Sequence, residues 1–178
     1  VDEVDITRIK PLPNLDYKIV CGDSLLSYPY IPKGLEKIEK LKEEFVNEVR
    51  IKEKNQLRQQ INQAIYSLYE NTEKSLGYRV SFDFNVNFSE VFRQKDGFDI
   101  AIANPPYVRQ ERIKDYKPLL RKADYKVYSS TSDLYTYFYE KSYNILARNK
   151  FLCFISIMKW MRAKYGEKLR KFFRGNTK

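Results

Sequence analysis

Asn104, Pro105, Pro106 and Tyr107 are the residues of this chain whose types and order could do chemistry, and they directly follow an apolar run at residues 98–103. Proline fixes φ and lacks a backbone N–H, so the tetrapeptide would present carbonyl oxygens without donors that compete for the same ligand. The side-chain oxygen of Asn104 and the carbonyl oxygen of Pro105 could both accept from one planar –NH2 group. The pattern therefore predicts a rigid acceptor site for an amino group.

Two acceptors aimed at one amino group would make that group a better nucleophile. The lone pair of a purine or amide –NH2 is delocalised, and hydrogen bonds to its N–H groups favour the pyramidal form that appears in the transition state. Tyr107 offers a flat face on which a base extruded from a duplex could stack. The structural alternative is a Pro-Pro turn that ends a strand, with Asn104 as its cap.

The segments around the tetrapeptide predict an α/β sheet that would place it at a ligand-binding edge. Residues 98–103 and 150–157 are short apolar runs, which are typical of buried parallel strands. Between them, residues 132–149 predict a helix capped by Ser132 or Asp133. Strand, helix and strand in this order favour a right-handed crossover, and open sheets bind ligands outside the carboxyl ends of their strands.

Three further segments complete the expected architecture. Residues 17–26, "YKIVCGDSLL", predict a buried strand that places Asp23 near its carboxyl end. Residues 34–76 carry apolar side chains at three- and four-residue steps, interrupted once, and predict two helices in a bent or hairpin arrangement. A single long helix is the alternative. Residues 78–88 alternate between aromatic and polar side chains and predict an extended segment. Cys21 and Cys153 lie in the apolar runs and are expected to be small core residues rather than metal ligands or a disulfide.

Composition narrows the classes of function. The sequence has no histidine, which excludes imidazole bases, Ser/His or Cys/His nucleophile pairs and most zinc sites. Its 33 Lys and Arg residues against 23 Asp and Glu residues give a net charge of +10, which favours a polyanionic partner such as nucleic acid. The longest apolar run, residues 151–158, is too short to span a bilayer and no signal-peptide core is seen, so we expect a soluble, cytoplasmic protein.

The tetrapeptide and its surroundings resemble the S-adenosylmethionine-dependent amino-methyltransferases, whose hallmark loop is Asn/Asp-Pro-Pro-Tyr/Phe/Trp. More narrowly, the chain is similar to the adenine-N6 DNA methyltransferase part of type IIG restriction-modification enzymes. The stretches that carry this resemblance follow the family's order and are residues 12–26, 82–92, 97–113, 133–146 and 151–173. The resemblance implies a partial Rossmann-like α/β fold with a mostly parallel sheet.

The resemblance also implies a role for each residue of the motifs. Asn104 and Pro105 would bind the amino group of the target adenine, Tyr107 would stack on its ring, and Pro106 would keep the loop rigid. Asp23 and Ser24, in "CGDSL", match the place where the family binds the adenine end of S-adenosylmethionine, although Asp23 could equally cap the following turn. Asp133, Leu134 and Tyr135 resemble a motif on a helix beside the cofactor pocket. A helix cap followed by core residues is the alternative for these three.

The chain also lacks features of that family. Its six glycines form no glycine-rich cofactor loop upstream of Asp23, and the acidic residue that binds the cofactor's ribose is missing as well. We therefore expect a fragment that is inactive alone and that works with an upstream cofactor-binding half and a downstream target-recognition region of a parent polypeptide. Its expected parts are residues 1–33 at the start of the methyltransferase core, a helical insertion at residues 34–77, and residues 78–178 with the tetrapeptide.

Arg109, Arg112, Lys159 and Trp160 are the candidates for contacts with double-stranded DNA, since basic residues cluster after the tetrapeptide and again near residue 160. An ordinary solvated basic surface is the alternative. Two other functions compete with adenine methylation. A protein glutamine N5-methyltransferase would use the same loop, because a side-chain amide presents the same –NH2 group. A methyltransferase-like fold could also serve only as a DNA-binding scaffold.

Overall fold

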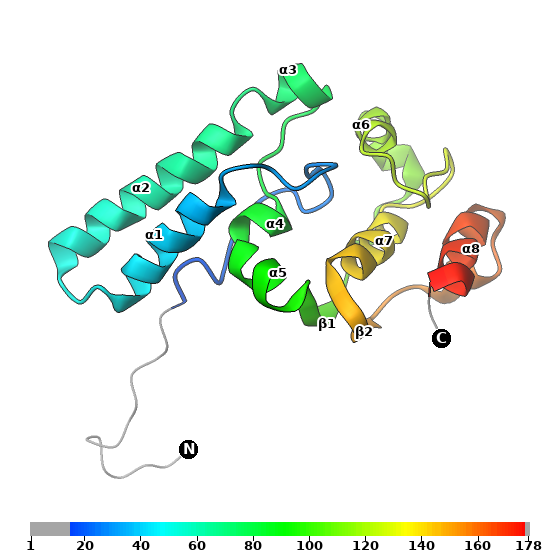
Figure 1. The fold of residues 1–178 in the computed structure, drawn as a ribbon. Helices are drawn as coiled ribbons and strands as arrows, with labels where there is room; N and C mark the ends of the chain where they lie inside the picture. The colour runs from blue at the N-terminus through cyan, green and yellow to red at the C-terminus, as the bar shows by residue number, and fades with distance from the viewer. Residues whose placement is uncertain (1–14, 177–178) are drawn as a thin grey trace, which may run out of the picture.

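The computed structural model describes residues 15–176. These residues form several helices and a small sheet (Figure 1). The longer elements are α1 (Leu35–Asn47), α2 (Ile51–Tyr69), β1 (Phe98–Ala103), α7 (Tyr135–Ile145), β2 (Leu146–Phe154) and α8 (Glu167–Asn176). The shorter helices are α3 (Thr72–Leu76), α4 (Phe84–Asn87), α5 (Ser89–Lys95) and α6 (Lys117–Lys122), and single 3₁₀ turns lie at Gln110–Ile113, Met158–Met161 and Lys164–Gly166. The fold is a partial α/β fold, as predicted.

β1 and β2 form a parallel two-stranded sheet, which confirms the strand predicted at residues 98–103. The strand predicted at residues 150–157 is also present, but it begins at Leu146 and ends at Phe154, so the helix predicted to residue 149 already ends at Ile145. In the register Ile100 lies opposite Phe151, and Ile102 lies opposite Cys153. α7 lies against the sheet, and it runs directly into β2 without a loop (Figure 1). Gly97, at the entrance to β1, has φ of 143°, and a Cβ there would lie 2.7 Å from the Ile145 carbonyl oxygen. Only glycine fits this close approach.

The helical segment is an α1–α2 hairpin, so the prediction of two helices in residues 34–76 is confirmed. Ile38 and Phe45 of α1 and Ile61 of α2 are buried between the hairpin and the rest of the chain. Figure 1 shows the two helices side by side at one end of the molecule. Lys42 is buried as well, and its ammonium group donates to the Asn87 carbonyl at 2.5 Å and to Glu90 at 3.2 Å. This lysine therefore attaches α1 to the α4–α5 region.

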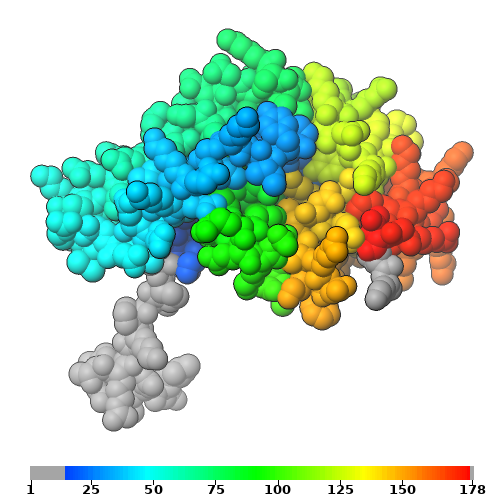
Figure 2. Space-filling model, viewed as in Figure 1, coloured from blue at the N-terminus to red at the C-terminus, as the bar shows by residue number. Residues whose placement is uncertain are grey.

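Aromatic side chains dominate the core on the other side of the molecule, around α7. Tyr135 and Tyr137 of α7 are fully buried, together with Leu120 of α6 and Leu169 of α8. Glu140 of α7 is also buried, and its carboxylate accepts from two backbone N–H groups, of Lys126 at 3.1 Å and Val127 at 2.8 Å. These bonds hold the segment before α7 against the helix. Figure 2 shows the α1–α2 hairpin and the α6–α8 region at opposite ends of the surface.

Two predicted extended segments are wrong. Residues 17–26 form turns and bends instead of a buried strand, because Tyr17 adopts a left-handed φ of 62° and its ring packs edge-on against Phe45 of α1. Residues 78–83 form bends and irregular backbone instead of a strand, and the Asp83 carboxylate accepts from the Val86 backbone N–H at 3.1 Å and so starts α4. The aromatic alternation there reflects a cluster of phenylalanine rings around Phe84 rather than a strand.

The predicted burial of the cysteines is also wrong, since Cys21 and Cys153 are both exposed. Cys21 lies in the turn segment that replaces the expected strand. Cys153 lies on β2, on the sheet face that α7 does not cover. β1 was expected to be a central strand, but Ile100 and Ile102 are exposed on that same face. The apolar runs that form β1 and β2 therefore predict the strands without predicting which face of the sheet this chain covers.

Candidate active site

The Asn104–Tyr107 loop leaves the carboxyl end of β1, at the edge of the sheet where it was predicted. The ladder continues one residue past β2, because the Ile155 N–H donates to the Ala103 carbonyl at 3.1 Å. The loop then turns back across the end of β2, and the Tyr107 hydroxyl donates to the Ile155 carbonyl at 2.9 Å. Ile155 thus holds both the start and the end of the tetrapeptide through its backbone.

The first residues of α7 hold the other side of the loop. The Leu134 N–H donates to the Val108 carbonyl at 3.0 Å, and the Gln110 N–H donates to the Asp133 carboxylate at 2.9 Å. The predicted cap of this helix is therefore wrong, because Asp133 accepts from the loop and Leu134, at the cap position, makes no side-chain cap bond. Ser132 is buried, and its hydroxyl donates to the Tyr165 carbonyl instead.

The four residues of the tetrapeptide differ in exposure in a way that suits an open acceptor site. Pro105 is buried, whereas Asn104 and Pro106 are exposed. The Asn104 amide has no hydrogen-bond partner among residues 15–176, so its oxygen is available to a ligand. Tyr107 is 44% exposed, and the edge-to-face contact with the Tyr135 ring, at 6.3 Å and 75°, supports its ring from behind. The Tyr107 ring therefore contacts the core on one side, while the rest of the ring remains open to solvent.

A cleft of about 460 Å³ lies beside the loop and is lined by Tyr107, Arg109, Glu111 and Arg112. Both arginines are exposed. Hydrogen bonds from its own backbone N–H and from the Gln110 side chain lower the pKa of Glu111, so this carboxylate is charged at neutral pH. The two predicted DNA-contacting arginines thus lie next to the predicted stacking residue, with one carboxylate between them in sequence.

Lys117 stabilises this side of the loop, a role that the sequence did not predict. It is buried, and its ammonium group donates to the Ser130 carbonyl and lies 3.5 Å from the Gln110 side-chain oxygen. Burial lowers the pKa of Lys117, and the nearby charges of Asp133 and Glu111 oppose that shift. The lysine therefore ties residue 110 to the loop before α7. An isolated Lys in "KDYKPLL" carries no sequence signal for this role.

Asp23 occupies a turn, and its carboxylate has several partners. One oxygen accepts from the N–H groups of Leu25 at 2.9 Å and Leu26 at 3.2 Å, as a turn cap does. The Tyr116 hydroxyl donates to the same carboxylate, at 2.6 Å from the other oxygen. Burial, and then this hydrogen bond, raise the pKa of Tyr116. Tyr116 follows the tetrapeptide and so links the two motifs, a connection across 93 residues that the sequence does not reveal.

These residues fit only one end of S-adenosylmethionine. A carboxylate offers about four lone-pair sites, so the second oxygen of Asp23 could still accept from a purine amino group. Ser24 lies beside it and is half-buried. The sequence has no glycine-rich loop that would bind the remainder of the cofactor.

Lys159 and Trp160 lie in the 3₁₀ turn after β2, and the structure places them in different surroundings. Lys159 is exposed, whereas Trp160 is only 9% exposed. The indole ring packs between Tyr139, at 5.5 Å, and Phe173, at 5.9 Å. The Lys159 side chain is therefore open to solvent. The Trp160 ring is instead part of the core, where it packs against Tyr139 and Phe173.

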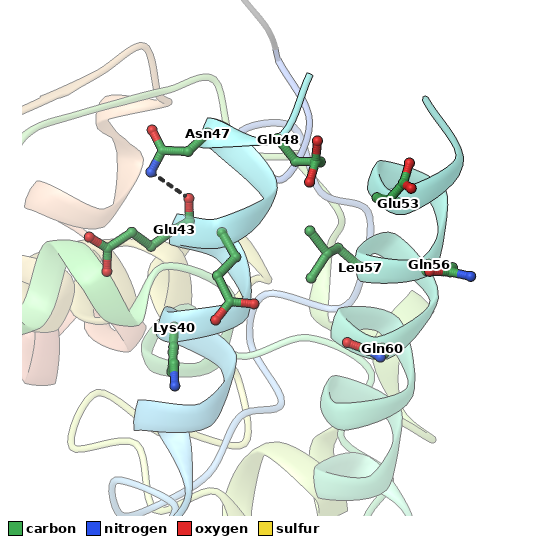
Figure 3. Close-up of a pocket in the computed structure, with 9 residues that line it drawn as sticks. Lys40, Glu43, Asn47, Glu48, Glu53, Gln56, Leu57 and Gln60 are labelled. Carbon is green, nitrogen blue, oxygen red and sulfur yellow. Dashed lines mark hydrogen bonds between the residues drawn. The ribbon is translucent and has the colours of Figure 1, made fainter. Parts of the chain in front are cut away.

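A larger cleft lies between α1 and α2, away from the tetrapeptide (Figure 3). It has a volume of about 620 Å³, and its charged lining is Lys40, Glu43, Glu44, Glu48 and Glu53. Asn47 lies at its rim and donates from its side chain to the Glu43 carbonyl at 3.0 Å. Four carboxylates against one ammonium group disfavour a phosphate backbone. This cleft is therefore a poor site for DNA.

Neither a metal site nor a membrane-spanning helix is found among residues 15–176. No group of three or more His, Cys, Asp or Glu side chains there could hold a metal ion. Within the same part of the chain, no helix combines the length and the apolar character needed to cross a membrane.

Comparison with known proteins adds independent findings. The model of the Eco57I restriction-modification methylase family matches residues 4–178. The chain is similar to the type II methyltransferase M.XhoI of Xanthomonas vasicola, with 41% identity over 73 residues that cover 41% of this chain and 13% of that protein. The type II methyltransferase M.BstVI of Geobacillus stearothermophilus is 37% identical over 81 residues, which cover 46% of this chain and 14% of that protein.

The type II restriction enzyme and methyltransferase RM.Eco57I of Escherichia coli is 33% identical over 82 residues, 44% of this chain and 8% of that protein. The matched regions thus span at most 14% of the length of these relatives. No solved structure gives a significant match to the chain.

Proposed function

Because the chain belongs to the Eco57I restriction-modification methylase family, we propose that it is the part of a DNA methyltransferase that holds the target base. In this proposal the parent enzyme transfers a methyl group from S-adenosylmethionine to the N6 amino group of an adenine flipped out of duplex DNA. The observation that carries the proposal is the acceptor loop at residues 104–107, in which the Asn104 amide is free among the described residues and which the hydrogen bonds from Tyr107 to Ile155 and from Gln110 to Asp133 hold at both sides. Such preorganised acceptors cost no reorganisation when the reaction occurs.

Asn104 and Pro105 bind and activate the amino group. The Asn104 side-chain oxygen and the Pro105 carbonyl oxygen accept from its two N–H bonds and draw the nitrogen toward the pyramidal geometry of the transition state. Pro106 keeps the backbone between them and Tyr107 rigid. The proton leaves after attack, since the protonated amine product is strongly acidic, and no histidine is needed.

Tyr107 stacks on the flipped base, and two residues of this chain support its ring. The hydroxyl bond to Ile155 and the edge contact with Tyr135 set the tilt of the ring. Base–aromatic stacking is worth about 1–3 kcal/mol, which helps to offset the unstacking of the base from the duplex. Asp133 positions this ring indirectly, because it fixes Gln110 three residues further along the chain.

Bound S-adenosylmethionine would supply the electrophilic methyl group, and Asp23 with Ser24 would hold its adenine end. Asp23 is already oriented by Leu25, Leu26 and Tyr116, which leaves one carboxylate oxygen with spare acceptor capacity. The remaining contacts come from an upstream half of the parent polypeptide. We therefore infer that residues 1–178 alone bind the cofactor weakly and transfer no methyl groups.

Double-stranded DNA is the proposed substrate, and Arg109 and Arg112 are the proposed phosphate contacts nearest to the base. Both are exposed in the cleft next to Tyr107, and Lys159 is exposed at the end of the neighbouring strand. The net charge of +10 supports the approach of a polyanion. Each phosphate contact steepens the salt dependence of binding, so Arg112→Gln should reduce the slope of log K against log salt concentration by about one unit.

The test of the function uses the complete parent polypeptide with labelled S-adenosylmethionine and duplex DNA. Digested DNA should contain labelled N6-methyladenine, and the label should disappear with Asn104→Ala. Asn85→Ala, which changes a half-buried asparagine outside the loop, is the matched control. Label in glutamine residues of added protein would instead identify a protein glutamine methyltransferase. DNA binding without any methylation would identify a scaffold.

A further inference from the structure

Among residues 15–176, the Tyr116 hydroxyl is the one side-chain donor to the Asp23 carboxylate. It lies 2.6 Å from Oδ2 and 2.8 Å from Oδ1 of that carboxylate. Oδ1 also accepts from the backbone N–H groups of Leu25 at 2.9 Å and Leu26 at 3.2 Å. A carboxylate offers about four lone-pair sites, so the site that remains open to a ligand is on Oδ2. Tyr116 therefore sets the direction in which Asp23 can accept.

The backbone of the turn that carries Asp23 is held by other residues. The Asp23 N–H donates to the Ser81 hydroxyl oxygen at 3.1 Å, and the Tyr78 hydroxyl donates to the Ser27 carbonyl at 2.8 Å. Both bonds come from the segment before α4, and neither involves Tyr116. Loss of the Tyr116 hydroxyl should therefore leave the course of the turn unchanged and affect the Asp23 side chain alone.

The Tyr116 side chain is itself well fixed. It is half-buried and packs against the aromatic core around α7. Its backbone N–H donates to the Ile113 carbonyl at 3.1 Å, at the start of α6, which lies beside the loop that precedes α1 (Figure 1). Burial raises the pKa of Tyr116, so the hydroxyl keeps its proton at neutral pH and remains a donor to Asp23.

We propose that Tyr116 is a positioning residue that makes Asp23 selective for the purine amino group of the cofactor. The inference rests on the proposed function, in which Asp23 holds the adenine end of S-adenosylmethionine. With the Tyr116 proton committed to it, the carboxylate can only accept, which suits an amino group at C6 of the purine. A purine with hydrogen at C6 offers no donor, and a carbonyl oxygen there would place two acceptors against each other.

The test compares the binding of two cofactors. Isothermal titration calorimetry on the complete parent polypeptide measures the dissociation constants of S-adenosylmethionine and of its analogue with hydrogen in place of the 6-amino group. The wild type should bind S-adenosylmethionine about tenfold more tightly than the analogue, as for one hydrogen bond to a charged group. Tyr116→Phe keeps the ring in the core, and it should weaken S-adenosylmethionine about fivefold while the analogue is unaffected, so that the ratio falls to about twofold.

The matched control is Tyr78→Phe, because it removes a tyrosine hydroxyl that donates to the same turn, at Ser27 instead of Asp23. It should leave the ratio of the two dissociation constants at the wild-type value. An unchanged ratio in Tyr116→Phe would overturn the proposal, since Tyr116 would then only support the fold. Equal binding of both cofactors by the wild type would overturn it together with the assignment of Asp23 to the cofactor. The role of Asn104 would still stand in that case, because its test measures DNA methylation.

Discussion

Replacement of Tyr107 separates the contribution of its ring from that of its hydroxyl. Tyr107→Phe removes one neutral hydrogen bond, from the hydroxyl to the Ile155 carbonyl at 2.9 Å. The ring is 44% exposed, so water can replace this partner and the loss is at the low end for a hydrogen bond, about 0.5 kcal/mol. The expected decrease in the rate of methyl transfer is then roughly twofold.

Tyr107→Ala removes the aromatic face as well. Stacking of one base on an aromatic ring contributes about 1–3 kcal/mol, which corresponds to a decrease of about 5- to 150-fold. The contact with Tyr135 is lost too, but Tyr135 stays buried and keeps its hydrogen bond to Tyr165. The loop itself should therefore stay in place, held by Leu134 and Asp133.

Single-turnover methylation of a duplex with one target site, in the complete enzyme, measures both variants. Tyr66→Ala is the control, because Tyr66 is similarly exposed but lies on α2. Equal losses for Tyr107→Phe and Tyr107→Ala would refute the reasoning, since the hydroxyl would then act directly. A wild-type rate for Tyr107→Ala would show that no base stacks on this ring.

Three further predictions concern stability and can be followed by circular dichroism during unfolding. Trp160→Ala should lower the free energy of unfolding by about 3–5 kcal/mol, because it removes a buried aromatic side chain. Met158→Ala, which changes an exposed side chain, should leave that free energy unchanged. Weaker DNA binding by Trp160→Ala at unchanged stability would contradict this prediction. Glu140→Ala leaves the buried Val127 N–H and the partly buried Lys126 N–H without their acceptor and should cost about 1–3 kcal/mol, with Glu140→Gln less damaging. Equal effects of the two substitutions would contradict this. Burial raises the pKa of Asp83. The contribution of this residue to stability is therefore fully present below about pH 4 and is lost as pH rises through its folded-state pKa. Asp83→Asn should flatten this decline of stability with pH, and an unchanged decline would contradict the prediction.

Local patterns were enough to predict the elements that carry the tetrapeptide. The apolar run at residues 98–103 is a strand and the run at residues 150–157 is a strand up to Phe154, and the three- and four-residue apolar spacing in residues 34–76 forms two helices. The apolar run at residues 17–26 is not a strand, because those residues lie in turns beside the α1–α2 hairpin. Hydrophobic period alone cannot distinguish such a segment from a strand.

The connections between distant segments could not be predicted. Asp133 looks like a helix cap in the sequence, but it accepts from Gln110, 23 residues earlier. Tyr116 meets Asp23 only because α6 folds back onto the turn at residue 23. The apolar runs also predict that both faces of the β1–β2 sheet are buried. They do not reveal that Ile100, Ile102 and Phe151 are exposed on one face. These features depend on tertiary contacts that no local pattern encodes.

The most direct test of the central claim is the product formed by the complete parent polypeptide on duplex DNA. Wild-type enzyme with S-adenosylmethionine should form N6-methyladenine, and Asn104→Ala should abolish that product while DNA binding is retained. Loss of DNA binding together with methylation would mean that Asn104 supports the fold rather than the chemistry. Methylation of another atom, or full activity of Asn104→Ala, would contradict the assignment of this loop as the site that holds the adenine amino group.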